Sequence, residues 1–126
     1  MGTAGRFRRD GDRLTVLAPA KLNLDLLVGP VRYDGYHDID SVVCRIDLCD
    51  EITISPPGEE GLAFASSGIP AGPDAENIAY YAARRLLEYA RNEGRAIPSL
   101  GISLHKRIPP GSGLGSSSTM VATLVG

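Results

Sequence analysis

The sequence predicts an α+β domain in which an antiparallel or mixed β-sheet is combined with helices. Three observations lead to this class. Apolar and polar residues alternate over residues 14–28, an Asp-Gly pair follows as a turn, and apolar residues recur at helical spacing over residues 75–92. At 126 residues, the chain is long enough to build one hydrophobic core.

The first strand is expected from Leu14 to Val28, because one face of that segment is apolar and the other is polar. Its apolar positions are Leu22, Leu24, Leu26 and Val28, and its polar positions are Lys21, Asn23 and Asp25. A turn over residues 32–36 follows, since Asp-Gly readily adopts the positive φ of a tight turn.

Two further strands are expected, over residues 37–47 and 51–55, with Leu48-Cys49-Asp50 as the turn between them. The Pro-Pro-Gly sequence at residues 56–58 ends the second of these. The early part of the domain is therefore predicted to be antiparallel β-structure.

A loop over residues 66–73 precedes the predicted helix, with Asp74 as its N-cap and Gly94 as its C-terminal stop. The helix is expected from residue 75 to residue 92, with an apolar stripe that packs on the core. A further strand includes Ile102 and Leu104 and reaches residues 108–110. After a glycine-rich turn, a buried helix is expected from Ser116 onward.

Charge and composition exclude several classes of protein. The net charge of −2 argues against a dedicated nucleic-acid-binding protein, and the arginines at positions 6, 8 and 9 are assigned to a flexible tail over residues 1–12. Cys44 and Cys49 have neither a zinc-site spacing nor a disulfide pattern, so both are expected to be reduced. No segment approaches the roughly 20 apolar residues of a membrane helix, and no secretory signal opens the chain, which favours a cytoplasmic protein.

The segment from Pro109 to Thr119 joins a predicted strand to the start of a predicted helix. Free backbone N–H groups and the positive end of the helix dipole attract anions at such a junction, and phosphate is the natural ligand. Glycines at positions 111, 113 and 115 allow close approach of the backbone, while the hydroxyls at 116–119 can donate to phosphate oxygens or help to hold a metal ion.

Other interpretations of this segment are open from the residues alone. It is not a Walker A loop, because no Gly-Lys-Ser/Thr ends it. A dinucleotide-binding turn would require a parallel βαβ unit and an acidic residue about 20 positions later. A purely structural glycine-rich turn is the remaining alternative, since short glycine motifs have many false positives.

Three separated segments resemble one family of kinases. Residues 109–118 resemble the Pro-x-x-x-Gly-Leu-Gly-Ser-Ser loop of the GHMP superfamily, whose members phosphorylate galactose, homoserine, mevalonate and phosphomevalonate. Residues 18–24 (Ala-Pro-Ala-Lys-Leu-Asn-Leu) resemble the first strand of its diphosphocytidyl-methylerythritol kinase branch, and residues 34–37 (Asp-Gly-Tyr-His) resemble the substrate-binding turn of that branch. Residues 76–87 are similar to a helix of the same enzymes, so the likeness spans residues 16–125.

The resemblance implies the N-terminal, ATP-binding domain of a GHMP kinase, a ribosomal protein S5 domain 2-like fold with a left-handed βαβ unit. This domain would occupy residues 13–126 and be incomplete at its C-terminus. The implied activity is ATP-dependent phosphorylation of a hydroxyl of cytidine-diphosphate-linked methylerythritol, a step of non-mevalonate isoprenoid precursor synthesis. The general-base aspartate of the family lies in a later Gly-Ala-Asp segment, so the chain is expected to be a truncated enzyme that is inactive alone.

The resemblance also implies roles for particular residues. Lys21 would be the catalytic lysine, and Asn23, Tyr36 and His37 would bind the cytidine end of the substrate. ATP and Mg²⁺ would be the cofactors, with Ser117 or Ser118 as a candidate metal ligand. The phosphate-binding residues would be Pro109, Gly111, Ser112, Gly113, Leu114, Gly115, Ser116, Ser117, Ser118 and Thr119. The adenine pocket is expected in the loop over residues 66–73 and the helix after it.

The sequence departs from this branch at Met120, where its members carry Asp or Asn. This difference favours the version of the loop found in the wider superfamily. A kinase for mevalonate, homoserine or a sugar is therefore the alternative enzyme. A non-catalytic nucleotide-binding module is the alternative outside the enzymes. The Tyr36-His37 turn discriminates among the enzymes, because only a cytidine-linked substrate requires it.

Overall fold

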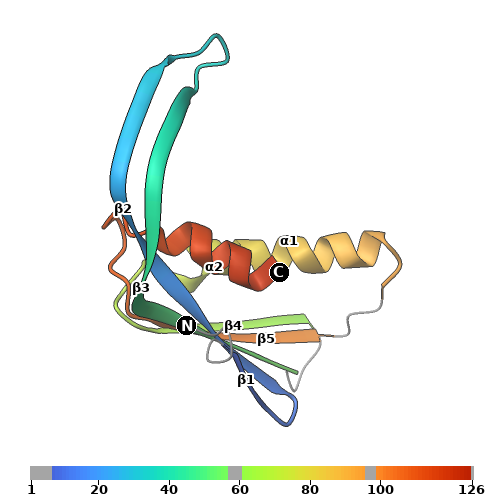
Figure 1. Cartoon of the computed structure of the whole chain (residues 1–126). Coiled ribbons are helices and arrows are strands. Elements are labelled where there is room, and N and C mark those ends of the chain that lie inside the picture. The colour runs from blue at the N-terminus through green and yellow to red at the C-terminus, as the bar shows by residue number, and fades with distance from the viewer. Residues whose placement is uncertain (1–6, 57–60, 96–98, 126) are drawn as a thin grey trace.

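The computed structural model describes residues 7–56, 61–95 and 99–125 of the chain. Within these ranges, four strands come first along the chain and are followed by a helix, a fifth strand and a second helix (Figure 1). They are β1 (Phe7–Asp10), β2 (Arg13–Val31), β3 (His37–Ser55), β4 (Gly61–Gly68), the 3₁₀ turn η2 (Asp74–Glu76), α1 (Ile78–Asn92), β5 (Ser99–Lys106) and α2 (Ser116–Val125).

The five strands form one mixed sheet in the order β1-β2-β3-β5-β4. All neighbouring strands are antiparallel except β4 and β5, which are parallel and are joined through α1. Both helices lie on the same side of this sheet (Figure 1). The predicted α+β class with a mixed sheet is therefore confirmed, and a doubly wound parallel sheet is excluded.

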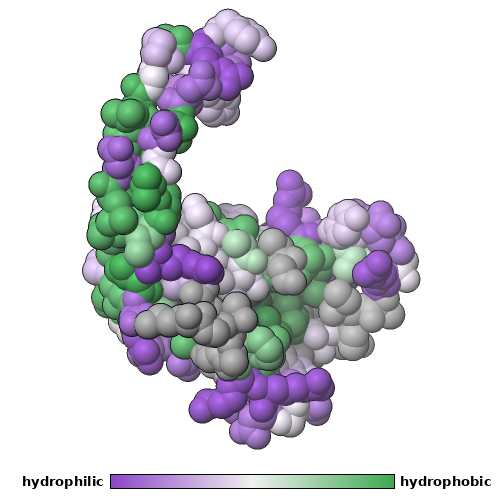
Figure 2. Space-filling view, in the orientation of Figure 1, coloured by the Kyte–Doolittle hydropathy of each residue, from purple (hydrophilic) through white to green (hydrophobic). Residues whose placement is uncertain are grey.

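The β2–β3 hairpin is much longer than the rest of the sheet. Its register shifts between Pro19 and Lys21 and again between Asn23 and Asp25, as happens at β-bulges. Beyond these irregularities, residues 21–45 extend away from the body as an arm (Figure 1). Apolar side chains remain exposed along it, including Leu24 and Ile39, and Figure 2 shows them as a hydrophobic band. The arm is thus a projecting hairpin with little core of its own.

The core lies between the body of the sheet and the two helices. The sheet contributes Ile52, Ile102 and Leu104, each at most 3% exposed. The helices contribute the small side chains of Ala79 and Ala83 from α1 and the larger Met120 and Leu124 from α2. Helix α1 packs mainly against α2, and α2 packs against β2.

Helix α1 agrees closely with the segment predicted for residues 75–92, but its N-cap does not. Asp74 begins the 3₁₀ turn, whereas Asn77 caps the helix, with its Oδ1 accepting from the Ala79 N–H at 3.0 Å. Gly94, at φ +71°, closes the C-terminal end with its N–H on the Arg91 carbonyl. The predicted C-terminal stop is confirmed.

Three predictions for the strands need correction. Strand β3 runs without interruption from His37 to Ser55, so the turn expected at residues 48–50 was wrong. Residues 66–68 of the expected loop belong to β4, which pairs with β5. Residues 7–10 of the expected tail form β1, while residues 1–6 of that tail lie outside the described residues. In each case the segment gains backbone hydrogen bonds from a neighbouring strand.

Two other expectations concern bonds and membranes. Cys44 and Cys49 form no disulfide bond, in agreement with the expectation of reduced thiols. Within the described residues, neither helix has the length and apolar character needed to cross a membrane.

Candidate functional site

The glycine-rich segment forms the connection between β5 and α2, in the strand-loop-helix order that the sequence predicted. Gly111, Gly113 and Gly115 all have positive φ, at +70°, +74° and +74°. A side chain at any of them would be strained, since L-residues with a Cβ rarely adopt this region. Helix α2 begins at Ser116, and the Thr119 N–H donates to the Gly115 carbonyl. The loop therefore presents its backbone at the N-terminal end of a helix, which suits an anion.

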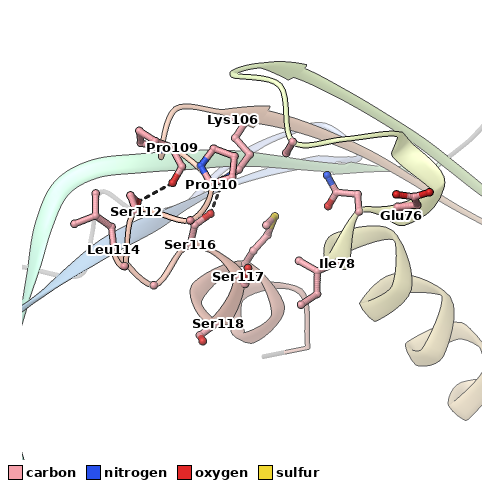
Figure 3. Close-up of a pocket in the computed structure, with 16 residues that line it drawn as sticks. Glu76, Ile78, Lys106, Pro109, Pro110, Ser112, Leu114, Ser116, Ser117 and Ser118 are labelled. Atoms are coloured by element: carbon pink, nitrogen blue, oxygen red, sulfur yellow. Dashed lines mark hydrogen bonds between the residues drawn. The ribbon is translucent and has the colours of Figure 1, made fainter.

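A cavity of about 400 Å³ opens beside this loop (Figure 3). On one side the loop and the first turn of α2 form its wall, and on the other side it meets residues around the start of α1. Figure 3 shows Ile78 pointing towards the first turn of α2, with Glu76 farther from the loop, beside the start of α1. Residues 109–118 line the cavity, and Thr119 does not. Ala71, Asn77 and Ile78 also line it, which is where the adenine pocket was expected.

The hydroxyl groups of the loop have different surroundings. Ser112 Oγ donates to the Pro109 carbonyl at 2.7 Å, which closes the loop on itself. Ser116 is half-buried and donates to Asp50 Oδ2 at 2.9 Å. Ser117 and Ser118 are exposed in the first turn of α2. Because the proton of Ser116 is already committed to Asp50, Ser117 and Ser118 are the better donors to a ligand.

A buried network lies beneath the loop. Asp50 on β3 is fully buried, and its Oδ2 accepts from the Lys106 ammonium at 2.9 Å, while its Oδ1 accepts from the Arg107 and Ile108 N–H groups at 2.7 and 2.8 Å. The Lys106 ammonium also donates to Ser116 Oγ. One carboxylate thus joins β3, the end of β5 and the start of α2, and it holds the strand that leads into the loop.

The same contacts decide the ionisation of Asp50. Burial alone raises the pKa of a carboxyl group, because it disfavours the charged form. Here the hydrogen bonds from the Ile108 N–H, Lys106, the Arg107 N–H and Ser116 outweigh burial and hold the pKa of Asp50 below its ordinary value. Asp50 is therefore an anion at neutral pH, and Lys106 is its buried counter-ion.

Lys21, the predicted catalytic lysine, contacts the loop directly. Its backbone N–H donates to the Leu114 carbonyl at 2.8 Å, and its side chain crosses the face of Gly115. A Cβ on Gly115 would lie 2.7 Å from Lys21 Cγ, so only glycine allows this approach. The Lys21 ammonium donates to Asn23 Oδ1 at 2.7 Å. Two predicted site residues on β2 are thus brought to the edge of the loop.

Tyr36 and His37 are not brought to the same place. They lie at the tip of the arm, away from the glycine loop (Figure 1). The Tyr36 N–H donates to Asp34 Oδ1 at 3.1 Å, and His37 Nδ1 lies 2.7 Å from the Gly29 carbonyl, to which it donates. Both side chains are exposed, with 74% of Tyr36 accessible. A ligand would have to bridge the tip and the loop, or the arm would have to bend, for one molecule to contact both.

The cavity also contains oxygen ligands that suit a divalent cation. Within the described part of the chain, Glu76 is the one carboxylate that lines it, and no group of three or more His, Cys, Asp or Glu residues is placed to hold a metal. Mg²⁺ usually binds one or two carboxylates together with substrate phosphates and water. A Mg²⁺ ion in this cavity would therefore arrive with a phosphorylated ligand and take protein oxygens from Glu76 on one side or from Ser117 and Ser118 on the other.

Asp50 and Lys106 were missed by the sequence reasoning. Asp50 was assigned to a turn because it follows Leu48-Cys49, and Lys106 carries no motif of its own. A signal was present, since an Asp inside an otherwise alternating apolar strand has to find a partner when it is buried. Its partners are 56 to 66 residues away in the sequence, so the pattern alone does not identify them.

Comparison with known proteins finds a matching domain family and several similar kinases. Residues 77–126 match the GHMP kinases N terminal domain. The chain is 41% identical over 108 residues to 4-diphosphocytidyl-2-C-methyl-D-erythritol kinase of Neisseria gonorrhoeae (strain NCCP11945), covering 86% of this chain and 37% of the relative. It is 42% identical over 115 residues to the enzyme of the same name from Geobacter sulfurreducens, covering 90% of this chain and 39% of the relative.

Solved structures agree with the sequence relatives. A crystal structure of 4-(cytidine 5'-diphospho)-2C-methyl-D-erythritol kinase matches 88% of this chain and 38% of that chain, with a TM-score of 0.71 and 37% identity. Homoserine kinase from Cytophaga hutchinsonii ATCC 33406 matches 94% of this chain and 35% of that chain, with a TM-score of 0.62 and 26% identity. The chain thus spans less than two fifths of the length of each of these proteins.

Proposed function

We propose that this chain, which has the fold of a GHMP kinase N-terminal domain, is the nucleotide-binding part of a kinase that uses ATP to phosphorylate a hydroxyl of 4-diphosphocytidyl-2-C-methyl-D-erythritol. The reaction would serve non-mevalonate isoprenoid precursor synthesis. Relatives bearing this name share 41 to 42% identity with most of the chain, which supports the substrate.

The observation that carries the proposal is the contact of Lys21 with the glycine loop. The loop offers backbone N–H groups at the start of α2 for the phosphates of ATP, and Ser117 and Ser118 add hydroxyl donors. Lys21 is tied to the same loop through Leu114 and Gly115. The phosphates of ATP and the Lys21 ammonium would therefore be held by the same glycine loop. Phosphoryl transfer requires this, because its catalysis depends on positioning.

Lys21 would place a positive charge where negative charge develops during phosphoryl transfer. Its ammonium donates one proton to Asn23, and its other two N–H donors are left for a ligand. A fixed cation beside the acceptor hydroxyl and the transferred phosphoryl group stabilises the negative charge of the transition state. ATP bound with Mg²⁺ would bring the phosphoryl group itself, and Glu76 with Ser117 or Ser118 would hold that cation.

The acceptor end of the site is assigned to the arm. Asn23 lies next to Lys21, and Tyr36 and His37 occupy the arm tip. The exposed ring of Tyr36 is available to stack on a cytosine, and His37 is available for a hydrogen bond through its second ring nitrogen. This part of the proposal distinguishes the cytidine-linked substrate from smaller acceptors.

ADP release by the intact protein with magnesium-ATP tests the proposal. The acceptors compared are 4-diphosphocytidyl-2-C-methyl-D-erythritol, mevalonate, homoserine and galactose. Turnover on the first alone is expected. Turnover on homoserine or another small acceptor would support the kinase activity and contradict the proposed substrate. Homoserine is the second candidate acceptor, because the fold also matches a homoserine kinase. ATP binding without turnover on any acceptor would favour a nucleotide-binding module.

A further inference from the structure

A second cavity, of about 430 Å³, shares no lining residue with the loop cavity. Its walls come from β2, the base of the arm and α2. Its polar side chains are Lys21 and Arg45 from the sheet and Thr119 and Thr123 from the helix. The proposed function makes use of Lys21 at its edge and leaves the other three without a role.

Arg45 is placed in this cavity by the register of the hairpin. It lies directly opposite Lys21 in the antiparallel β2–β3 pair, so that both side chains project from the same face of the sheet. The guanidinium of Arg45 has no hydrogen bond or ion pair with any residue in the described ranges, whereas Arg32 and Arg107 each have a carboxylate partner. Its five donors are therefore available to a ligand.

The helix side of the cavity is neutral and rich in donors. Thr119 and Thr123 are four residues apart on α2, so both hydroxyls lie on one face of the helix. Thr119 is in the first turn, where the helix dipole favours negative charge. No carboxylate lines the cavity within the described part of the chain. Two cations and two hydroxyls together form an environment for an anion that carries more than one negative charge.

We infer that this second cavity holds the phosphate groups of the acceptor, and that Arg45 is the residue that selects a phosphorylated acceptor over an uncharged one. The inference rests on the proposed function and adds a specificity residue to it. A guanidinium binds phosphate through two parallel N–H···O bonds, a geometry that a single uncharged hydroxyl group does not offer. Lys21 lines this cavity and contacts the glycine loop, so it would face both the nucleotide and the anchored acceptor. The arm would have to bend for the cytosine of the same acceptor to reach Tyr36.

Steady-state kinetics of the intact protein test this role. With Arg45→Met, the KM of the diphosphate-bearing acceptor is expected to rise roughly tenfold to a hundredfold, as for the loss of a hydrogen bond to a charged group. The KM of ATP is expected to stay within about twofold. Arg45→Lys keeps the charge without the fork and should recover part of the loss. Arg13→Met, an exposed arginine on the neighbouring strand β2 and outside the cavity, is the matched control.

The outcomes separate this inference from the proposed function. An unchanged acceptor KM in Arg45→Met, with wild-type turnover intact, overturns the role of Arg45 and leaves the kinase standing. If the wild type turns over no acceptor, the proposed function fails, and pyrophosphate titration of protein saturated with a non-hydrolysable ATP analogue decides the inference. Binding at least tenfold weaker in Arg45→Met than in Arg13→Met supports the anion site, and equal binding overturns it. Thermal unfolding of each variant confirms that it is folded.

Discussion

The ammonium group of Lys106 lies 2.9 Å from the carboxylate of Asp50, and these two side chains are only 5% and 0% exposed. The pair connects β3 to the end of β5, immediately before the glycine loop. Removing one member leaves an uncompensated charge in the interior, which costs far more than a surface ion pair contributes. Asp50 does not line the loop cavity. The geometry of the loop therefore depends on an ion pair whose carboxylate lies outside the ligand-binding surface.

Asp50→Asn is expected to destabilise the protein by about 3 to 5 kcal/mol, because the buried Lys106 loses its counter-ion. Urea unfolding at pH 7 measures the loss. Asp50→Asn combined with Lys106→Met removes the orphaned charge and should recover most of it. A double variant no more stable than Asp50→Asn would contradict this account.

The stability that Asp50 contributes should depend on pH in the acidic range. Its folded pKa lies below the unfolded value of about 3.9, so the contribution is complete above that value and is lost as the pH falls through the folded pKa. The difference in unfolding free energy between wild type and Asp50→Asn is therefore expected to be largest at pH 7 and to shrink below about pH 4. Urea unfolding at steps from pH 7 to pH 3 checks this, and a constant difference would contradict it.

The serines of the loop should divide into two groups. Ser116→Ala removes a hydrogen bond to Asp50 and one from Lys106, so it should cost about 1 to 3 kcal/mol of stability. The side chain of Ser117 is exposed, so Ser117→Ala should change the free energy of unfolding by less than about 0.5 kcal/mol while weakening ATP binding. Thermal unfolding and nucleotide titration of both variants separate the groups. Equal stability of the two would show that the buried network does not depend on Ser116.

Gly115→Ala and Gly113→Ala form a matched pair, since both glycines have φ +74°. Each substitution should cost about 1 to 2 kcal/mol for the left-handed backbone. At Gly113 the added Cβ meets nothing within 4 Å, whereas at Gly115 it meets Lys21 Cγ at 2.7 Å. The transfer rate at saturating ATP should therefore fall further in Gly115→Ala. Equal rates would mean that the contact with Lys21 does not position the lysine.

Lys21→Met keeps the apolar stem that packs on Gly115 and removes the charge. Phosphoryl transfer is expected to fall by about a hundredfold to a thousandfold, the usual effect of losing one donor that stabilises the transition state. Nucleotide affinity and thermal stability should change little. ADP release and nucleotide titration make the comparison, and a normal transfer rate would remove Lys21 from the catalytic group.

Local patterns in the sequence predicted the parts of the fold that local interactions determine. The helix over residues 78–92 has a strong apolar stripe, and the Asp34-Gly35 turn joins two strands that are neighbours in sequence. The glycine loop was predicted from its own residues, and Lys21 was predicted through the family resemblance. The structure confirms that these two segments are in contact.

The remaining features depend on partners that are distant in sequence. The local sequence favours a turn at Asp50, because its hydrogen-bond partners Lys106, Arg107 and Ile108 are distant in the chain. The serines at positions 66 and 67 look like loop residues until β5 supplies their strand pairing. Arg45 carries no signal of its own, because only the register of the hairpin places it beside Lys21. A linear pattern does not contain these pairings.

The position of β5 between β3 and β4 also sets the order in which a growing polypeptide can complete its sheet. The β2–β3 hairpin can form early, since its strands are consecutive and joined by a short turn. Strand β4 has no neighbour in the sheet until residues 99–106 have left the ribosome. During synthesis of α1, the edges of β3 and β4 that β5 will fill are therefore open, and this interval is when the nascent chain is most exposed to aggregation.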